Sequence, residues 1–179
     1  ADQVRQLNRK AGEVARSVCP SGKFVAGSVG PTGAMMEPFG DLSEARALEI
    51  FSRQMEGLLE GGVDLIVVET MMDINEAVAA VSAARKLDSR IPLVATMTFE
   101  QNPAGFATSM GIDPAMAFAR LSESGADILG ANCGRGVDEM IGIMKAFRSL
   151  TDMPLMAQAN AGIPEMEEGN LVYPETPEE

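Results

Sequence analysis

Apolar residues along the chain follow two alternating patterns, which predict strands and helices in turn. Short, nearly continuous apolar runs are typical of strands covered on both faces, as in parallel sheets. Five such runs lie at residues 23–30, 63–70, 91–99, 126–133 and 153–160. Between the runs, apolar residues recur every three or four positions, which predicts amphipathic helices. The clearest of these stripes consists of Val137, Met140, Ile141, Met144 and Phe147.

The residues at the expected helix ends support this division. Ser43, Asp73 and Asp113 stand where helices would begin, and their side chains are suited to cap the first backbone N–H groups. Glycines stand where helices would end, in the similar turns at 60–64 and 124–127. The chain therefore reads as successive βα units.

Two further segments complete the organisation. Residues 2–18 predict a helix before the first run, and the Pro-, Gly- and Glu-rich residues 162–179 predict a surface loop. No linker divides the chain. We expect residues 1–179 to form a single domain, which is part of a barrel.

The fold class is α/β, and two arrangements fit it: an open doubly wound sheet or part of a (β/α)8 TIM barrel. The barrel is favoured because every run ends in polar or special residues, and in a barrel those ends converge on one mouth. These residues are Gly30 with Thr32, Glu69 with Thr70, Thr96 with Thr98, Asn132 with Cys133, and Gln158 with Asn160. A complete barrel typically needs about 250 residues. We therefore expect the chain to be five βα units of a larger barrel.

Composition narrows the possible partners. The 179 residues are 46% hydrophobic and 22% charged, as in an ordinary globular domain. Fourteen Lys and Arg against 26 Asp and Glu give a net charge of −12, which argues against a nucleic-acid or anionic-membrane surface. Two cysteines, Cys19 and Cys133, are too few for a disulfide scaffold and fit a reducing cytoplasm. No membrane span or signal segment is expected.

Cys133 is the most informative single residue. A free cysteine often only fills space in a core. Its position after Asn132 at the end of a strand also suits a nucleophile or a soft metal ligand. The chain contains no histidine, which excludes a Cys-His pair within it. A catalytic zinc site needs about three protein ligands, and no other Cys or His lies near Cys133 in the sequence.

Other candidates lie at the remaining strand ends. Glu69 could hold the ammonium group of a ligand or form a salt bridge at the rim of the barrel. Asn160 offers both a donor and an acceptor, but Asn is also a common turn residue. The glycine-rich run at 27–33 could bind an anion through backbone N–H groups, although no Lys-Ser/Thr pair follows it as in a P-loop.

Taken together and in this order, the segments "GSVGPTG", "DLIVVETMMD", "ILGANCG", "QANAG" and "VYPETPEE" resemble the homocysteine S-methyltransferase family. That family includes the homocysteine-binding domain of cobalamin-dependent methionine synthase. The resemblance runs over essentially the whole chain. It implies a (β/α)8 barrel whose zinc ion is held by three cysteine thiolates, one after the sixth strand and an adjacent pair after the eighth.

The resemblance also implies roles for particular residues. Cys133 takes the place of the sixth-strand zinc ligand, and Glu69 and Asn160 line the amino-acid pocket. Gly30, Thr32 and Gly33 match the loop beside that pocket. The implied reaction is zinc-dependent methyl transfer to the thiol of homocysteine, giving methionine. The implied methyl carrier is cobalamin, on a partner domain or a corrinoid-binding protein.

The chain also departs from the family pattern. It has no "DGAMGT"-like first strand, no second strand and no cysteine pair, so its five strands would be the third to the seventh of eight. We expect the chain alone to be inactive. Two alternatives remain open at this point. One is a phosphate-binding barrel enzyme that uses "GRG" at 134–136 and the following helix N-terminus. The other is a non-catalytic fragment or subunit that lends its strands to a partner.

Overall fold

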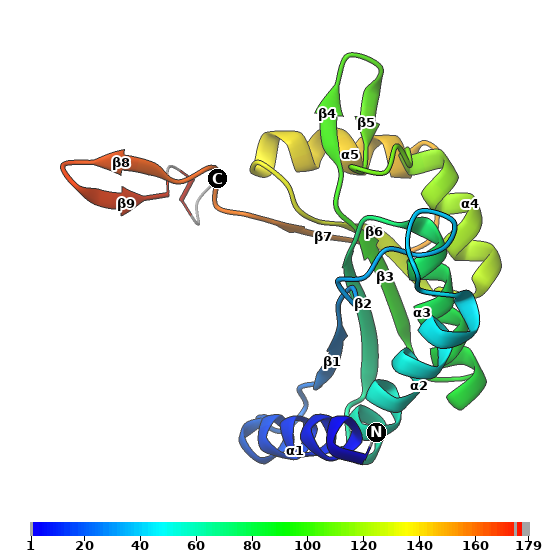
Figure 1. Cartoon of the computed structure of the whole chain (residues 1–179). Coiled ribbons are helices and arrows are strands. Elements are labelled where there is room, and N and C mark those ends of the chain that lie inside the picture. The colour runs from blue at the N-terminus through cyan, green and yellow to red at the C-terminus, as the bar shows by residue number, and fades with distance from the viewer. Residues whose placement is uncertain (1, 174, 177–179) are drawn as a thin grey trace.

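The computed structural model describes residues 2–173, 175 and 176. Helices and strands alternate along most of the chain, as predicted (Figure 1). The helices are α1 (Asp2–Val18), α2 (Glu44–Glu60), α3 (Ile74–Leu87), α4 (Pro114–Ser124) and α5 (Val137–Arg148). The strands are β1 (Ala26–Val29), β2 (Leu65–Met71), β3 (Leu93–Met97), β4 (Glu100–Asn102), β5 (Gly105–Ala107), β6 (Ile128–Cys133), β7 (Leu155–Ala159), β8 (Glu165–Glu167) and β9 (Asn170–Val172).

The five predicted strands form one parallel sheet in the order β1-β2-β3-β6-β7. A doubly wound sheet reverses its strand order at a switch point. Here the order follows the chain without reversal, as it does along the wall of a barrel. Figure 1 shows α2, α3 and α4 along one side of this sheet. The fold is therefore α/β with a parallel sheet, as expected.

The hydrophobic core lies between the sheet and these helices. Val29, Val68 and Leu93 are fully buried and belong to one cluster with Phe51 of α2 and Leu121 of α4. Because successive side chains of a strand point to opposite faces, the neighbours of these core residues point away from the helices. The opposite face of the sheet is therefore the one that carries the polar strand-end residues.

The predicted helix starts are confirmed. Ser43, Asp73 and Asp113 are the N-caps of α2, α3 and α4, and each side chain accepts a hydrogen bond from a backbone N–H group of the first turn. Gly125 ends α4 in the left-handed conformation, with φ of 104°. A residue with a Cβ atom is strained at such an angle, which explains the glycine at this turn.

The contact between α1 and α2 is unusually close. A Cβ atom added to Gly57 of α2 would lie 2.3 Å from the carbonyl oxygen of Arg5 in α1. Real Cβ atoms do not approach backbone this closely, so only glycine allows the two helices to pack in this way.

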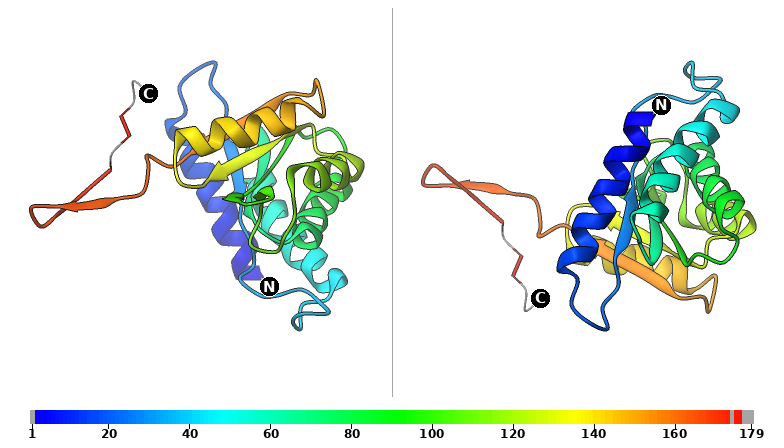
Figure 2. Two further views of the ribbon diagram at one scale, coloured as in Figure 1. Left: turned by 90° about the horizontal axis from the view of Figure 1, so that it is seen from above. Right: turned by 90° about the horizontal axis from the view of Figure 1, so that it is seen from below.

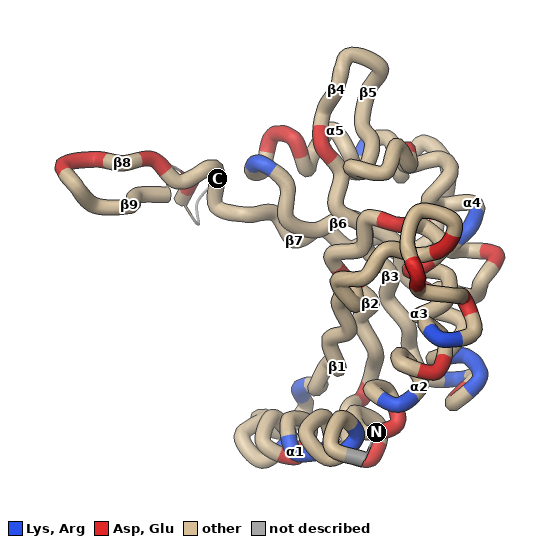
Figure 3. Tube along the Cα trace, viewed as in Figure 1, with Lys and Arg blue, Asp and Glu red and all other residues tan. Residues whose placement is uncertain are grey.

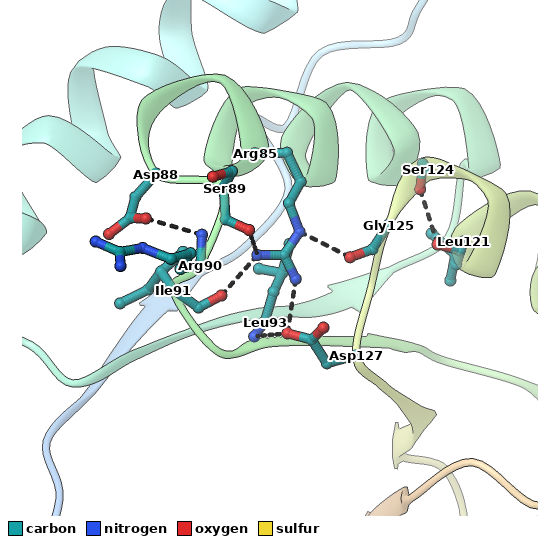
Figure 4. Close-up of polar contacts among 10 residues, drawn as sticks. All are labelled: Arg85, Asp88, Ser89, Arg90, Ile91, Leu93, Leu121, Ser124, Gly125 and Asp127. Carbon is teal, nitrogen blue, oxygen red and sulfur yellow. Dashed lines mark hydrogen bonds and ion pairs between the residues drawn. The ribbon is translucent and has the colours of Figure 1, made fainter.

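An ion pair at the amino ends of the strands joins α3, β3 and β6 (Figure 4). Arg85 Nη2 lies 2.6 Å from Asp127 Oδ2, and Arg85 also donates to the carbonyl oxygens of Gly125 and Ile91 at 2.8 and 2.6 Å. The same Asp127 oxygen accepts a hydrogen bond from Leu93 N at 2.9 Å. One arginine and one aspartate thus fasten the start of β6 to the start of β3.

The same arrangement recurs at the start of β2. Asp64 Oδ2 accepts hydrogen bonds from Arg16 Nη2 at 2.5 Å and from Val25 N at 2.6 Å, while Arg16 also donates to the Gly62 carbonyl. Asp64 and Asp127 occupy equivalent positions in the two similar turns that the sequence contains. Each aspartate accepts a hydrogen bond from a backbone N–H group at or directly before the start of the neighbouring strand of the sheet, and from an arginine of the helix before that strand.

Two hairpins were not predicted. β4 and β5 form one between β3 and α4, and β8 and β9 form another within the tail. The expectation that residues 162–179 form only a loop is therefore wrong for 165–172, and residues 174 and 177–179 lie outside the described part. Both views of Figure 2 show the β8–β9 hairpin extending away from the sheet and the helices.

Charged residues lie mainly on helices and loops, while the strands of the parallel sheet carry few of them (Figure 3). Within the described residues, none of the helices has the length and apolar character needed to cross a membrane.

Candidate functional site

The candidate site lies where the parallel strands end. Because all five strands run in one direction, their carboxyl ends lie along a single edge of the sheet (Figure 1). The register places Asn132 beside Gln158 and Cys133 beside Ala159, and Thr96 lies on β3, the strand on the other side of β6. The polar residues that the sequence spreads over a hundred positions are thus brought to one edge.

Cys133 is the last residue of β6 and is partly buried. Its backbone has φ of 63°, a left-handed conformation that costs a non-glycine residue on the order of 1–3 kcal/mol. Hydrogen bonds hold this conformation: Asn160 N donates to the Cys133 carbonyl at 3.2 Å, and Asn132 Nδ2 donates to Cys133 Sγ at 3.3 Å. The thiol is therefore held in a defined position at the strand end.

Glu69 lies near the end of β2 and is partly buried. The hydroxyl of Ser28, on the neighbouring strand β1, donates a hydrogen bond to its carboxylate. A neutral donor orients the carboxylate but leaves its charge uncompensated. Such a group is chemically suited to accept an ammonium ion.

The backbone after Glu69 is distorted. The register of β2 against β3 shifts between Val68 and Met71, and Thr70 within this bulge has φ of 63°. A β-branched residue rarely adopts this angle. Asn132 supports it, because its Oδ1 accepts from Thr70 N at 2.9 Å and its Nδ2 donates to Thr70 Oγ1 at 2.8 Å.

Asn160 lies beside Cys133, whereas the described contacts of the glycine-rich loop are with Glu76 and a methionine-lined pocket. Asn160 is exposed, and its Nδ2 donates to the Gly134 carbonyl at 2.9 Å, which leaves its side-chain oxygen available. Thr32 uses both its N and its Oγ1 to donate to the Glu76 carboxylate, each at 2.7 Å. Gly33 lines a pocket of about 290 Å³ together with methionines, whereas Gly30 is partly buried ahead of it.

The N-terminus of α5, which the phosphate hypothesis requires, already contacts carboxylates of the chain. Val137 N donates to both Glu175 oxygens, at 3.0 and 2.9 Å. Glu139 accepts from Arg135 N at 2.8 Å and from Gln101 N at 2.7 Å. A phosphate entering here would meet two negative charges, so the structure gives this hypothesis no support.

The described residues do not provide a complete set of metal ligands. Among residues 2–173, 175 and 176, no group of three or more Cys, His, Asp and Glu side chains could hold a metal ion. Cys133 offers one thiolate, whereas a zinc site needs about three or four protein ligands. The described residues therefore do not fit a complete zinc site.

Sequence reasoning missed the contacts that organise this edge. It noted Thr70, Thr96 and Asn132 as polar strand ends but did not anticipate that their side chains bond to one another. It also missed Ser28, whose only signal was its polar position within an otherwise apolar run.

Comparison with known proteins shows the family of the chain. A family model described as homocysteine S-methyltransferase matches residues 1–179. The chain belongs to the homocysteine S-methyltransferase family. This confirms the resemblance that implied roles for Cys133, Glu69 and Asn160, while those roles remain predictions.

Two relatives show how the length of the chain compares with that of whole proteins. It is 30% identical over 189 aligned residues to methionine synthase of Mycobacterium tuberculosis. This match covers all of the chain and 16% of that protein. It is 33% identical over 130 residues to betaine–homocysteine S-methyltransferase 1 of Rattus norvegicus. This match covers 72% of the chain and 30% of the rat protein. The chain thus spans about a sixth of the length of the methionine synthase and under a third of the betaine enzyme.

Solved structures of the homocysteine methyltransferase MmuM from Escherichia coli agree in fold. The apo form superposes with a TM-score of 0.73 at 24% identity, over 89% of this chain and 60% of that one. The metallated form gives a TM-score of 0.67 at 26% identity, over 88% and 59%. The parallel sheet and its helices therefore have the arrangement found in this family.

Proposed function

We propose that the protein to which this chain belongs transfers a methyl group to the thiol of homocysteine, giving methionine. The observation that carries the proposal is the family match over the whole chain, combined with a thiol and a carboxylate at one edge of the sheet. Glu69 binds the substrate ammonium group, and Asn160 contributes its free side-chain oxygen. Gly30, Thr32 and Gly33 shape the adjoining loop.

Cys133 supplies one of the thiolate ligands of a zinc ion in this proposal. Such an ion would need further ligands, because a zinc site uses about three or four. The five strands would correspond to the third to seventh strands of a complete barrel. When bound, zinc would stabilise the thiolate form of homocysteine, which is the nucleophilic form. The contribution of this chain is to bind and orient the amino acid.

The methyl donor in this proposal reaches the protein as methylcobalamin, carried by a corrinoid-binding domain or partner. The match to methionine synthase runs over the whole chain, whereas the match to the betaine enzyme covers 72% of it. We place the protein in the cytoplasm, because its two cysteines are unpaired. Residues 1–179 act as a single domain in this scheme.

The test is methionine formation by the full-length protein. Purified protein is incubated with homocysteine and one methyl donor at a time: methylcobalamin, betaine or S-methylmethionine. The methionine formed in each reaction is measured by mass spectrometry. We expect methionine with methylcobalamin. Product with betaine alone would overturn the choice of donor, and absence of product and of homocysteine binding would overturn the proposed function.

A further inference from the structure

Asn132 lies at the centre of a hydrogen-bonded cluster and is only 4% exposed. Its Oδ1 accepts hydrogen bonds from Thr70 N at 2.9 Å and from Thr96 Oγ1 at 2.8 Å. A backbone N–H can only donate, so the amide oxygen must face Thr70 N and the amide nitrogen must point the other way. The orientation of this amide is therefore fixed by its partners.

The amide nitrogen joins two strands. It donates to Thr70 Oγ1 at 2.8 Å and to Cys133 Sγ at 3.3 Å. Thr70 and Cys133 are both left-handed, with φ of 63°, and Asn132 bonds to both. One side chain thus links the distorted end of β2 to the thiol at the end of β6.

This link also fixes Glu69, which directly precedes Thr70. The Glu69 carboxylate is held by the Ser28 hydroxyl, and the backbone on its carboxyl side is held by Asn132. The carboxylate and the thiol are therefore not independent, because their relative position depends on the Asn132 amide.

We propose that Asn132 is a positioning residue that sets the span between the Glu69 carboxylate and the Cys133 sulfur. The inference rests on the proposed function, in which Glu69 binds the substrate ammonium group and Cys133 lies beside the substrate sulfur. A fixed span selects the length of the carbon chain between those groups. The site therefore prefers homocysteine to cysteine, which is one methylene shorter.

Two threonines on the same amide provide a matched pair of variants. Thr70→Val removes the acceptor of the Asn132 nitrogen, on the side that carries Glu69. Thr96→Val removes one donor to the Asn132 oxygen and leaves every contact to Thr70 and Cys133 in place. Asn132→Asp keeps the shape and the acceptor oxygen but loses both donated hydrogen bonds.

The measured quantity is the ratio of the dissociation constants for cysteine and homocysteine, obtained by calorimetry on the full-length protein. One methylene typically changes affinity about 10- to 200-fold in a fitted pocket. We expect a ratio in this range for the unsubstituted protein, a fall of at least about fivefold in Thr70→Val and Asn132→Asp, and a change within about twofold in Thr96→Val.

The ratio separates positioning from a merely structural role. A loss of stability alone would weaken the binding of both ligands equally and leave the ratio unchanged. An unchanged ratio in Thr70→Val or Asn132→Asp would therefore overturn the proposal, provided that the variant retains the circular dichroism spectrum of the folded protein. An equal fall in the two threonine variants would also overturn it. Failure of the unsubstituted protein to bind homocysteine would instead remove the proposed function, and the inference with it.

Discussion

The two ends of the parallel sheet use hydrogen bonds for different purposes. At the amino ends, the same arrangement occurs twice, with Asp64 and Arg16 at β2 and Asp127 and Arg85 at β6. At the carboxyl ends, the contacts around Asn132 occur once and hold two strained backbone positions. Repetition is expected of a device that only fastens βα units together, whereas a single irregular cluster is expected of a site.

The difference predicts that the two ends can be damaged separately. Substitutions at the amino ends should lower stability and leave ligand binding intact, while substitutions at the carboxyl ends should do the reverse. Single substitutions at each end test this division.

Replacing Cys133 by Ser should lower the rate of methionine formation by more than about 100-fold. Substituting a residue that only hydrogen-bonds to a metal ligand typically lowers metal affinity or activity 10- to 100-fold, and the loss of a ligand should be larger. The urea midpoint of unfolding should stay close to that of the unsubstituted protein, since the thiol is only partly buried. The measurements are initial rates by mass spectrometry and urea titration followed by circular dichroism.

Cys19→Ser is the matched control for this substitution. Cys19 lies after α1, remote in sequence from the candidate site, and is also partly buried. It should retain full activity. Equal rates in the two serine variants would show that Cys133 has no part in the reaction.

Replacing Arg85 by Ala should lower the free energy of unfolding by about 2–3 kcal/mol, because it leaves the Gly125 and Ile91 carbonyls and the Asp127 carboxylate without their partner. The dissociation constant for homocysteine should not change in the folded protein. Urea titration and calorimetry provide the two measurements.

Arg53→Ala is the control for Arg85, since Arg53 contacts only Glu49 on an exposed helix face in the interactions described. It should change stability little. Weaker homocysteine binding in folded Arg85→Ala would contradict the separation of the two ends.

The parallel strands and the helix starts could be predicted from the sequence, because each of them depends on the chemistry of neighbouring residues. Apolar runs, capping residues and helix-ending glycines identified the five parallel strands and the helix starts at Ser43, Asp73 and Asp113. The similar turns around Asp64 and Asp127 were also recognised. Their carboxylate bonds were not, because they depend on arginines from preceding helices.

The site could be predicted only as a set of strand ends. The contacts of Asn132 depend on the bulge that turns Thr70 to a φ of 63°, and no local pattern indicates that bulge. The tail hairpin was missed for another reason: its strands are exposed and only three residues long, so they lack the long apolar run by which strands were recognised.

Replacing Glu69 by Gln should raise the KM for homocysteine about tenfold, the effect of losing about 1.4 kcal/mol from a charge-assisted contact with the ammonium group. The value of kcat should change less, since the thiol is untouched. Steady-state kinetics measure both. Glu123→Gln, an exposed change at the end of α4, should alter neither. An unchanged KM in Glu69→Gln would remove this residue from the substrate pocket.

At the amino ends, stability should depend weakly on pH. The hydrogen bond from Val25 N and the neighbouring Arg16 lower the pKa of Asp64 below its ordinary value. A carboxylate with a lowered pKa in the folded state contributes stability above the unfolded value of about 3.9, and this contribution disappears as the pH falls through the lower, folded value.

Asp64→Asn removes the titrating group and keeps an oxygen that can accept from Val25 N. We therefore expect the variant to be less stable than the unsubstituted protein at pH 7 and to lose less stability on acidification below about pH 4. Urea midpoints at several pH values measure this loss. If the two proteins lose stability in parallel, Asp64 is not a charged anchor of the amino ends. The division between a fastened end and a binding end would then rest on the Arg85 arrangement alone.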